Sequence, residues 1–197
     1  MSKREYFNDH ANRWDELYHQ QNSEQLQALV KRFEIRKSDW ILDVGTGTGI
    51  LLPYLIRHIG EEGRLFALDF SSEMLSLAKS RLPDERISFV NSDVGKMPLQ
   101  NELIDRVICF ASFPHFEDKP KALREMSRVL KKGGKLFIAH LLSSQKIKAH
   151  HLKAGGEVKN DTLPSGRVMK KMMMKAKFRG IRIIDQPSLY LAQGEKW

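Results

Sequence analysis

A strand followed by a glycine-rich turn is predicted for Trp40-Ile41-Leu42-Asp43-Val44-Gly45-Thr46-Gly47-Thr48-Gly49-Ile50. The first half is apolar, as in a buried strand, and glycines then recur at every second residue before a segment that favours a helix. Glycine lets the backbone approach a ligand closely, and the first turn of the helix presents unpaired N–H groups. The segment therefore predicts a ligand-binding turn, with a plain strand-to-helix turn as the alternative.

A second short strand is predicted over residues 64–69, and it ends in the carboxylate of Asp69. Glycines after the first strand of a βαβ unit, with an acid after the second, bind the ribose of an adenosine cofactor. The dinucleotide fingerprint is G-x-G-x-x-G, whereas here the glycines alternate as G-x-G-x-G after Asp43. A carboxylate at that position is a poor neighbour for a pyrophosphate and a tolerable one for a sulfonium and an ammonium group.

These features resemble the class I S-adenosylmethionine-dependent methyltransferases, and within them the small-molecule branch typified by ubiquinone/menaquinone C-methyltransferases. The resemblance covers roughly residues 40–139. It rests on five segments in order: residues 42–49 (LDVGTGTG), 68–75 (LDFSSEML), 91–94 (NSDV), 105–108 (DRVI) and 128–136 (RVLKKGGKL). It implies S-adenosylmethionine as the cofactor.

The resemblance also implies which residues surround the cofactor. We expect Asp69 to bind the ribose hydroxyls, Asp93 to meet the adenine edge, and Asp43 to order the loop and the amino-acid end of the cofactor. The expected cofactor-binding residues are Asp43, Gly45, Gly47, Gly49, Asp69, Phe70, Met74, Asp93, Val94 and Phe110. Taken alone, Asp69 could be a helix cap and Asp93 a turn residue.

Four histidines are candidates for the acceptor side of the site. His115 follows the fourth predicted strand, where family members often carry a histidine, and His140 ends the fifth; His150 and His151 lie on the segment after it. Histidine can act as a general base near neutral pH, so His115, His140 and His151 are the expected catalytic residues. Each taken alone is as well explained as a helix-end or surface residue. No tight spacing of ligands supports a metal site.

Strands alternate with helices, which predicts an α/β fold with a mostly parallel, doubly wound sheet. Strands are expected at about 40–45, 64–69, 86–91, 104–110 and 135–141, helices at about 49–59, 72–82 and 118–131, and Gly133-Gly134 ends the last helix. Helical spacing over residues 2–37 includes Leu17 and Tyr18. Ser143 and Ser144 can cap a helix through His151, a further helix follows Pro164, and short strands are expected at 181–184 and 189–192. By resemblance the sheet is Rossmann-like and seven-stranded with an antiparallel last strand.

One domain is expected, in four parts: an N-terminal helical cap (1–38), a cofactor-binding core (39–139), an insertion or lid (140–164), and a C-terminal helix with a strand pair (165–197). The cap and the insertion are expected to enclose the acceptor. The expected substrate or lid residues are Tyr6, Phe7, Trp14 and His150. Gly155-Gly156 would be a hinge, with Lys153, Lys159 and Asp161 keeping the open lid soluble. The alternative is that the aromatic residues attach a helix to the core.

The formal net charge is +9, with the densest basic group at Arg167, Lys170, Lys171, Lys175, Lys177, Arg179 and Arg182. We interpret this group as the solvated face of an amphipathic helix. The single cysteine, Cys109, lies in an apolar strand, so a reducing cytoplasm is expected. No apolar run is long enough to span a bilayer, and neither a membrane nor a nucleic acid is an expected partner.

The expected function is methyl transfer to a small-molecule acceptor by in-line displacement, in which positioning of donor and acceptor supplies most of the catalysis. An RNA or protein methyltransferase that docks its substrate on the basic helix is one alternative. A non-enzymatic S-adenosylmethionine-binding protein is the other. The attacking atom of the acceptor and the oligomeric state stay open.

Overall fold

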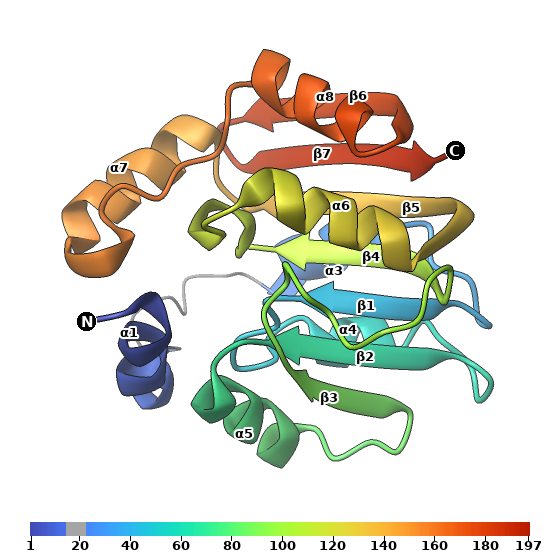
Figure 1. Cartoon of the computed structure of the whole chain (residues 1–197). Helices are drawn as coiled ribbons and strands as arrows, with labels where there is room; N and C mark the ends of the chain where they lie inside the picture. The colour runs from blue at the N-terminus through green and yellow to red at the C-terminus, as the bar shows by residue number, and fades with distance from the viewer. Residues whose placement is uncertain (15–22) are drawn as a thin grey trace.

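The structure is a computed structural model that describes residues 1–14 and 23–197. Its centre is a seven-stranded sheet with the order β3-β2-β1-β4-β5-β7-β6 (Figure 1). The strands are β1 (Trp40–Val44), β2 (Arg64–Asp69), β3 (Ile87–Asn91), β4 (Ile104–Phe110), β5 (Leu130–His140), β6 (Phe178–Gln186) and β7 (Leu189–Lys196). β7 is antiparallel to β5 and β6, and the other neighbouring pairs are parallel. This confirms the expected Rossmann-like α/β fold with an antiparallel last strand.

Helices cover both faces of the sheet. They are α1 (Lys3–His10), α3 (Ser23–Lys31), α4 (Leu52–Ile56), α5 (Ser72–Arg81), α6 (Lys119–Val129), α7 (Ser144–Ala154) and α8 (Gly166–Lys175), with short 3₁₀ turns η1 (Ala11–Arg13), η2 (Phe113–His115) and η3 (Gly156–Val158). α3 and α4 pack on one face, and α6 and α8 on the other. α1 and α7 lie beyond the carboxyl ends of the central strands (Figure 1). Among the described residues, no helix is long and apolar enough to cross a membrane.

The central strands are apolar on both faces because each face carries a helical layer. In β1, Leu42 and Val44 join the core beneath α6 and α8, whereas Ile41 between them joins the core beneath α3 and α4. Successive side chains of a strand point to opposite faces, so one short strand supplies both cores. Such a strand reads as a continuous apolar run rather than an alternating one.

The N-terminal part is less helical than its spacing predicts. The expected helix over residues 2–37 is interrupted by η1, and α3 ends at Lys31. Glu34 has φ +52°, outside the helical region, so the chain turns there toward β1. Leu17 and Tyr18 lie outside the described residues. The helix expected at 49–59 is also short, because residues on both sides of Leu52–Ile56 form turns.

Two boundaries after α6 also differ from those expected. α6 ends at Val129 and β5 starts directly at Leu130, so Gly133 and Gly134 lie inside a strand instead of ending a helix. Gly133 has φ +76°, and the pairing of β4 with β5 shifts register nearby. A glycine pair inside a strand accommodates such an irregularity, and propensity alone cannot distinguish it from a glycine pair that ends a helix.

The predicted basic helix is shorter than expected as well. α8 ends at Lys175, Lys177 has φ +66°, and β6 begins at Phe178. Arg179 and Arg182 of the basic group therefore lie on an edge strand rather than on the helix. The amphipathic spacing of α8 continues into a strand because both elements pack apolar residues, including Phe178, on the same core.

A buried arginine ties β4 to the segment before β1. Arg106 is almost fully buried, and its guanidinium donates to the carbonyl oxygen of Glu34 at 2.7 and 3.0 Å. It also pairs with the buried carboxylate of Asp39, with Nε and Oδ2 3.0 Å apart. Removing one partner of such a pair leaves a buried charge and a carbonyl without hydrogen bonds, which is costly.

Arg106→Met should therefore lower the free energy of unfolding by about 2–4 kcal/mol, measured by urea denaturation. The matched control is Arg179→Met, which removes an arginine–glutamate pair on an exposed strand edge and should cost less than about 1 kcal/mol. Equal losses in the two variants would show that the buried pair does not stabilise the fold as described.

Candidate functional site

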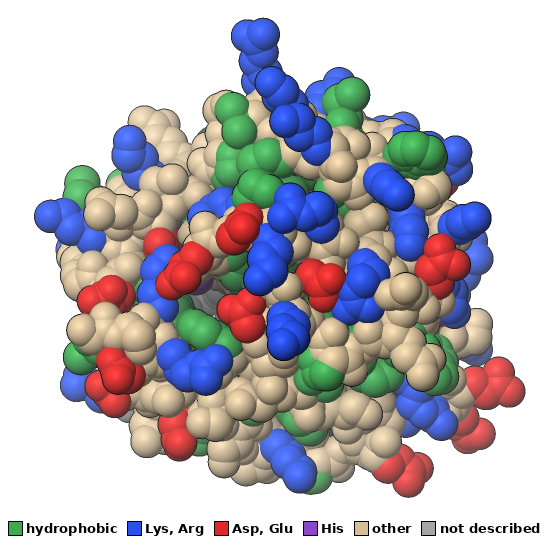
Figure 2. Space-filling model, viewed as in Figure 1, with side chains coloured by type: hydrophobic (Ala, Val, Ile, Leu, Met, Phe, Trp, Pro, Cys, Tyr) green, Lys and Arg blue, Asp and Glu red, His purple; other side chains and the backbone are tan. Residues whose placement is uncertain are grey.

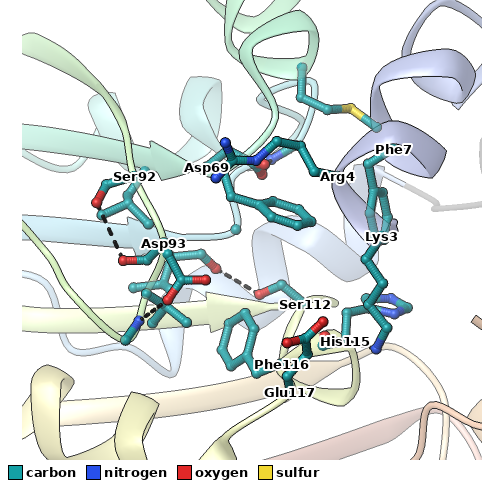
Figure 3. A pocket seen from close by; sticks show the side chains of 18 of the residues that line it. Lys3, Arg4, Phe7, Asp69, Ser92, Asp93, Ser112, His115, Phe116 and Glu117 are labelled. Atoms are coloured by element: carbon teal, nitrogen blue, oxygen red, sulfur yellow. Dashed lines mark hydrogen bonds between the residues drawn. The ribbon is translucent and has the colours of Figure 1, made fainter. Parts of the chain in front are cut away.

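A cavity of about 350 Å³ opens at the carboxyl ends of β1, β2 and β4, with α1 along one side (Figure 3). Its walls come from the turns that follow the first four strands and from the N-terminal helix. Ligands of open α/β sheets bind at this edge, where the order of strands reverses, and the volume is in the range of small-ligand sites. In this sheet the reversal lies between β1 and β4.

The three glycines after β1 all have positive φ, but they have different surroundings. A Cβ on Gly45 would lie 2.4 Å from Cβ of Ser112, and one on Gly49 would lie 3.0 Å from Cβ of Ala78. A Cβ on Gly47 would meet nothing within 4 Å, and Gly47 lines the cavity. Gly45 therefore allows two turns to approach, Gly49 packs against α5 away from the cavity, and Gly47 leaves space for a ligand.

Asp43 is buried beneath this turn and does not line the cavity. Its Oδ2 accepts a hydrogen bond from the Thr46 hydroxyl at 2.7 Å, whereas Oδ1 has no hydrogen-bond partner among the residues that the structure describes. Burial raises the pKa of Asp43 to about 7. The carboxylate thus holds the turn through Thr46, and the negative charge of Asp69 also raises the pKa of Asp43.

Asp69 lines the cavity at the end of β2, as expected. Its Oδ2 accepts from the backbone N–H of Gly47 and its Oδ1 from that of Ser71, both at 2.9 Å. Burial raises the pKa of Asp69 to about 6 against the lowering effect of these bonds. Each carboxylate oxygen keeps a lone pair for a ligand hydroxyl. Phe70 and Met74 line the cavity beside it, also as expected.

The turn after β3 supplies the opposite wall. Asp93 and Val94 line the cavity, and Asp93 Oδ1 accepts from the backbone N–H of Gly95 at 2.6 Å (Figure 3). Asp93 is therefore both a turn residue and a cavity residue, so the two interpretations of it are compatible. Its other carboxylate oxygen, Oδ2, is the group that can meet a ligand amine.

Phe110 does not line the cavity, in contrast to its expected role. It lies at the end of β4 in the core beneath α3 and α4, because strand alternation points it to that face. The residues that reach the cavity from this strand are Ala111, at φ +55°, and Ser112. The Ser112 hydroxyl donates to the Val44 carbonyl at 2.6 Å (Figure 3). Sequence reasoning missed Ser112, since a serine in a turn carries no distinctive signal.

His115 lies in η2 and lines the cavity, and its partner is a residue that the sequence did not single out for this role. Its Nδ1 is 2.7 Å from Oδ2 of Asp161. Asp161 was expected to be a solubilising lid residue, but it is buried and also binds Nζ of Lys3, at 2.5 Å from Oδ1. Burial lowers the pKa of His115 and keeps the ring neutral near physiological pH.

The other three histidines are placed differently. His151 is buried on α7, with its ring 4.8 Å from that of His115 and its Nδ1 2.6 Å from the Asp161 carbonyl oxygen. His140 is buried at the end of β5, and burial lowers its pKa to about 3. His150 is exposed on α7. Of the four, only His115 lines the cavity. The expected convergence of His140, His150 and His151 on the cavity is therefore not observed.

α1 contributes both expected and unexpected residues to the cavity. Phe7 and Trp14 line it, whereas Tyr6 stacks on His10 with ring centroids 4.3 Å apart and does not. Lys3 and Arg4 also line it, and the Arg4 guanidinium lies 5.9 Å from the centroid of the Phe70 ring. Two basic residues near a chain start give no sequence signal of a site, because their partners are more than sixty positions away.

The described residues contain no group of three or more His, Cys, Asp and Glu side chains that could hold a metal ion. Cys109 is buried in β4 with its sulfur 3.0 Å from the Ser112 hydroxyl, and burial raises the pKa of the thiol to about 12. A thiol that stays protonated is a poor nucleophile, so Cys109 is a core residue.

Known proteins share this architecture. A methyltransferase domain family model matches residues 42–138. A crystal structure of an S-adenosylmethionine-dependent methyltransferase from Aquifex aeolicus has a TM-score of 0.72 and 22% sequence identity, over 91% of this chain and 96% of that one. Phosphoethanolamine N-methyltransferase 2 of Haemonchus contortus, in complex with S-adenosylmethionine, has a TM-score of 0.77 and 16% identity, over 96% of this chain and 60% of that one.

One group of relatives is recognisable by sequence. The ubiquinone/menaquinone biosynthesis C-methyltransferase of Vibrio vulnificus is 32% identical over 122 residues, which are 57% of this chain and 47% of that protein. The chain thus spans about half the length of the curated relatives it matches. The segment that the family model matches, residues 42–138, contains the glycine turn, the carboxylate at the end of β2 and the histidine turn after β4. Residues 42–138 therefore form a methyltransferase domain, and these similarities together support a class I S-adenosylmethionine-dependent methyltransferase.

Proposed function

We propose that this protein transfers the methyl group of S-adenosylmethionine to a small-molecule acceptor held in the cavity. The observation that carries the proposal is the conjunction at one cavity edge of Gly47, whose missing Cβ leaves open space, and Asp69, whose carboxylate faces that space. The open space admits a ligand against the backbone, and the carboxylate suits a pair of ribose hydroxyls. When bound, the cofactor supplies an electrophilic methyl group.

The residues present fit this cofactor in charge as well as in shape. Asp43 has an unpartnered buried carboxylate oxygen, within the described part of the chain, directly beneath the turn. Its negative charge favours cationic groups across the turn, and a sulfonium and an ammonium are such groups. In this proposal Gly47 and Asp69 bind the cofactor, Asp93 and Val94 contact the base, and Asp43 stabilises the cationic end.

A small acceptor is supported by the shape of the remaining cavity. Phe7 and Trp14 from the N-terminal part and Phe116 from the turn after β4 give it apolar walls. α1 closes one side, and it is attached to the 140–164 segment through the Lys3–Asp161 ion pair. We propose that these two segments act as the lid that excludes water and determines the acceptor.

The basic face of α8 does not contribute to the cavity. Arg167, Lys170, Lys171 and Lys175 are exposed on this helix, which lies over β6 and β7, and lysine and arginine side chains gather there together with exposed apolar ones (Figure 2). A macromolecular substrate docked on this face would have to reach around the sheet to the cavity. The geometry therefore favours a small acceptor over an RNA or a protein.

The direct test of the activity is a panel of small acceptors. The purified protein should release S-adenosylhomocysteine from S-adenosylmethionine only when a suitable phenol, amine, thiol or carbon acid is present, which is measured by mass spectrometry. Gly47→Val serves as the inactive control. Binding of S-adenosylmethionine without turnover of any acceptor, including RNA and protein extracts, would leave a binding protein and overturn the enzymatic proposal.

Gly47→Val should abolish measurable S-adenosylmethionine binding, because the side chain would fill the space that the ligand needs. Gly133→Val is a matched control, since Gly133 also has a positive φ and open space around its Cβ, but lies in β5 away from the cavity. Both variants should lose about 1–3 kcal/mol of stability from backbone strain. Calorimetric titration would contradict the assignment if both variants bound the ligand equally well.

S-Adenosylmethionine affinity should rise as pH increases from about 5.5 to 7, because the pKa values of Asp69 and Asp43 are about 6 and about 7 and a cationic ligand favours the ionised forms. Asp43→Asn should flatten the upper part of this profile. The folding stability of the ligand-free protein should change with pH in the opposite direction to the affinity. A folded-state pKa above the unfolded value contributes stability that is complete below about pH 4 and is lost as pH rises through about 7. Calorimetry and thermal melts give both profiles, and an unchanged affinity profile in Asp43→Asn would contradict the assignment.

A further inference from the structure

Asp161 connects three segments that are distant in sequence. Its Oδ2 is 2.7 Å from Nδ1 of His115, its Oδ1 is 2.5 Å from Nζ of Lys3, and its backbone oxygen is 2.6 Å from Nδ1 of His151. Burial by itself would raise the pKa of Asp161, but the hydrogen bonds from His115 and Lys3 outweigh this effect and lower it. Asp161 is therefore an ionised, nearly buried carboxylate that contacts two cavity residues, His115 and Lys3.

The carboxylate determines which nitrogen of His115 carries the proton. An ionised carboxylate can only accept hydrogen bonds, so Nδ1 of His115 must be the donor. Nε2 then carries the lone pair, and no described residue hydrogen-bonds to it. The His115 side chain keeps 12% of its surface exposed and lines the cavity. Nε2 of His115, which Asp161 does not contact, is thus the ring atom with an available lone pair.

Packing fixes the plane of the His115 ring. The Phe7 ring lies edge-on at 5.2 Å between centroids, and the His151 ring lies 4.8 Å away. His151 cannot present a ring nitrogen to the cavity as His115 does, because it is buried and does not line the cavity. Its Nδ1 is already hydrogen-bonded to the Asp161 carbonyl oxygen. Lys3 also donates to the His115 backbone oxygen at 3.1 Å, so α1 holds both members of the pair.

We propose that Asp161 is a positioning residue that orients His115 as the general base of the methyl transfer, and that Lys3 compensates its charge. The inference rests on the proposed function and specifies the acceptor class. The acceptor reacts through an O–H, N–H, S–H or C–H group whose proton must leave, rather than through the lone pair of a tertiary amine or a thioether.

The proton and electron balance is complete without a further reactant. As the acceptor atom forms its bond to the methyl carbon, the electron pair of the broken carbon–sulfur bond stays on sulfur. The proton of the acceptor moves to Nε2 of His115, and the carboxylate of Asp161 stabilises the resulting imidazolium. The imidazolium returns this proton to water before the next cycle. Asp161 and Lys3 act in the reaction only through His115, so they are positioning residues and not catalytic ones.

Other charged groups around His115 affect its titration. The carboxylate of Asp161 raises the pKa of His115, whereas burial and positive charge on His151 and Lys3 lower it. His140 on β5 interacts electrostatically with His115 and His151. Lys119 on α6 interacts electrostatically with Asp161 and Lys3. Removing the carboxylate of Asp161 should therefore lower the pKa of His115, and removing the ammonium of Lys3 should raise it.

The test uses nitrogen-15 NMR of the histidine rings in the full chain with S-adenosylhomocysteine bound. Wild-type His115 should be the Nδ1–H tautomer. Asp161→Asn should lower the pKa of His115 and shift the ring toward a mixture of tautomers, because an amide can also donate. Lys3→Met should raise the pKa and keep the Nδ1–H tautomer. Asp185→Asn, which removes the exposed carboxylate that binds Ser144 at the start of α7, is the matched control and should change neither property.

S-Adenosylhomocysteine affinity should be unchanged within twofold in all three variants, since neither Lys3 nor Asp161 belongs to the proposed cofactor contacts. In the acceptor panel, compounds with a transferable proton should turn over at least tenfold more slowly with Asp161→Asn, and tertiary amines and thioethers should not react with any form.

The outcomes separate the two proposals. An Nε2–H tautomer in the wild type, or pKa shifts of the same sign in Asp161→Asn and Lys3→Met, would overturn the positioning role even if the enzyme is active. Turnover of a tertiary amine would overturn the acceptor class. Failure of the wild type to bind S-adenosylhomocysteine would instead refute the proposed function. If Asp161→Asn does not fold, the tautomer of the wild type and the pKa shift of Lys3→Met still decide the positioning role.

Discussion

The site depends on the carboxylate of Asp69, which joins the turns after β1 and β2. It accepts the backbone N–H groups of Gly47 and Ser71 at once, so the glycine turn and the start of α5 are held by one side chain. Because Gly47 and Asp69 are fixed relative to each other, the cavity has its shape before any ligand enters. Preformed geometry of this kind lowers the ordering cost of binding.

That arrangement places two acids, Asp43 and Asp69, in a buried region where burial raises both pKa values. Two buried carboxylates so close together are unfavourable for the ligand-free protein, since the negative charge of Asp69 also raises the pKa of Asp43. A cationic ligand relieves this cost. In the proposed function, this charge pattern favours a cationic ligand over a neutral or anionic one.

The opposite side of the cavity has a different electrostatic character. There the carboxylate of Asp161 is balanced by Lys3 and hydrogen-bonded to a neutral His115. The side with Asp43 and Asp69 thus carries buried acids, whereas the side with His115 carries a neutral ring beside a carboxylate that Lys3 balances. α1 and the segment before α8 build this second side together, because Lys3 on α1 binds both the backbone oxygen of His115 and the carboxylate of Asp161.

Local sequence was sufficient for the strands and the glycine turn, because strand period and turn chemistry are short-range properties. The order of the family motifs placed Asp69, Met74, Asp93 and Val94 at the edge that lines the cavity. Local sequence was insufficient where a side chain's role depends on the face of a strand, as for Phe110, or on the backbone angle at one residue, as at the end of α8. Tyr6 and Phe7 are adjacent in the chain, yet only Phe7 reaches the cavity.

Long-range pairing decided the rest. Asp161 sits in a polar segment that reads as a solvated loop, and nothing in its neighbours indicates that it meets residues 46 and 158 positions away. The sequence offered His115, His140, His150 and His151 as candidates for one site, but burial and tertiary packing place only His115 of these four in the cavity. Sequence patterns report what a segment does with its neighbours, whereas a buried ion pair between distant segments exists only because the whole fold brings them together.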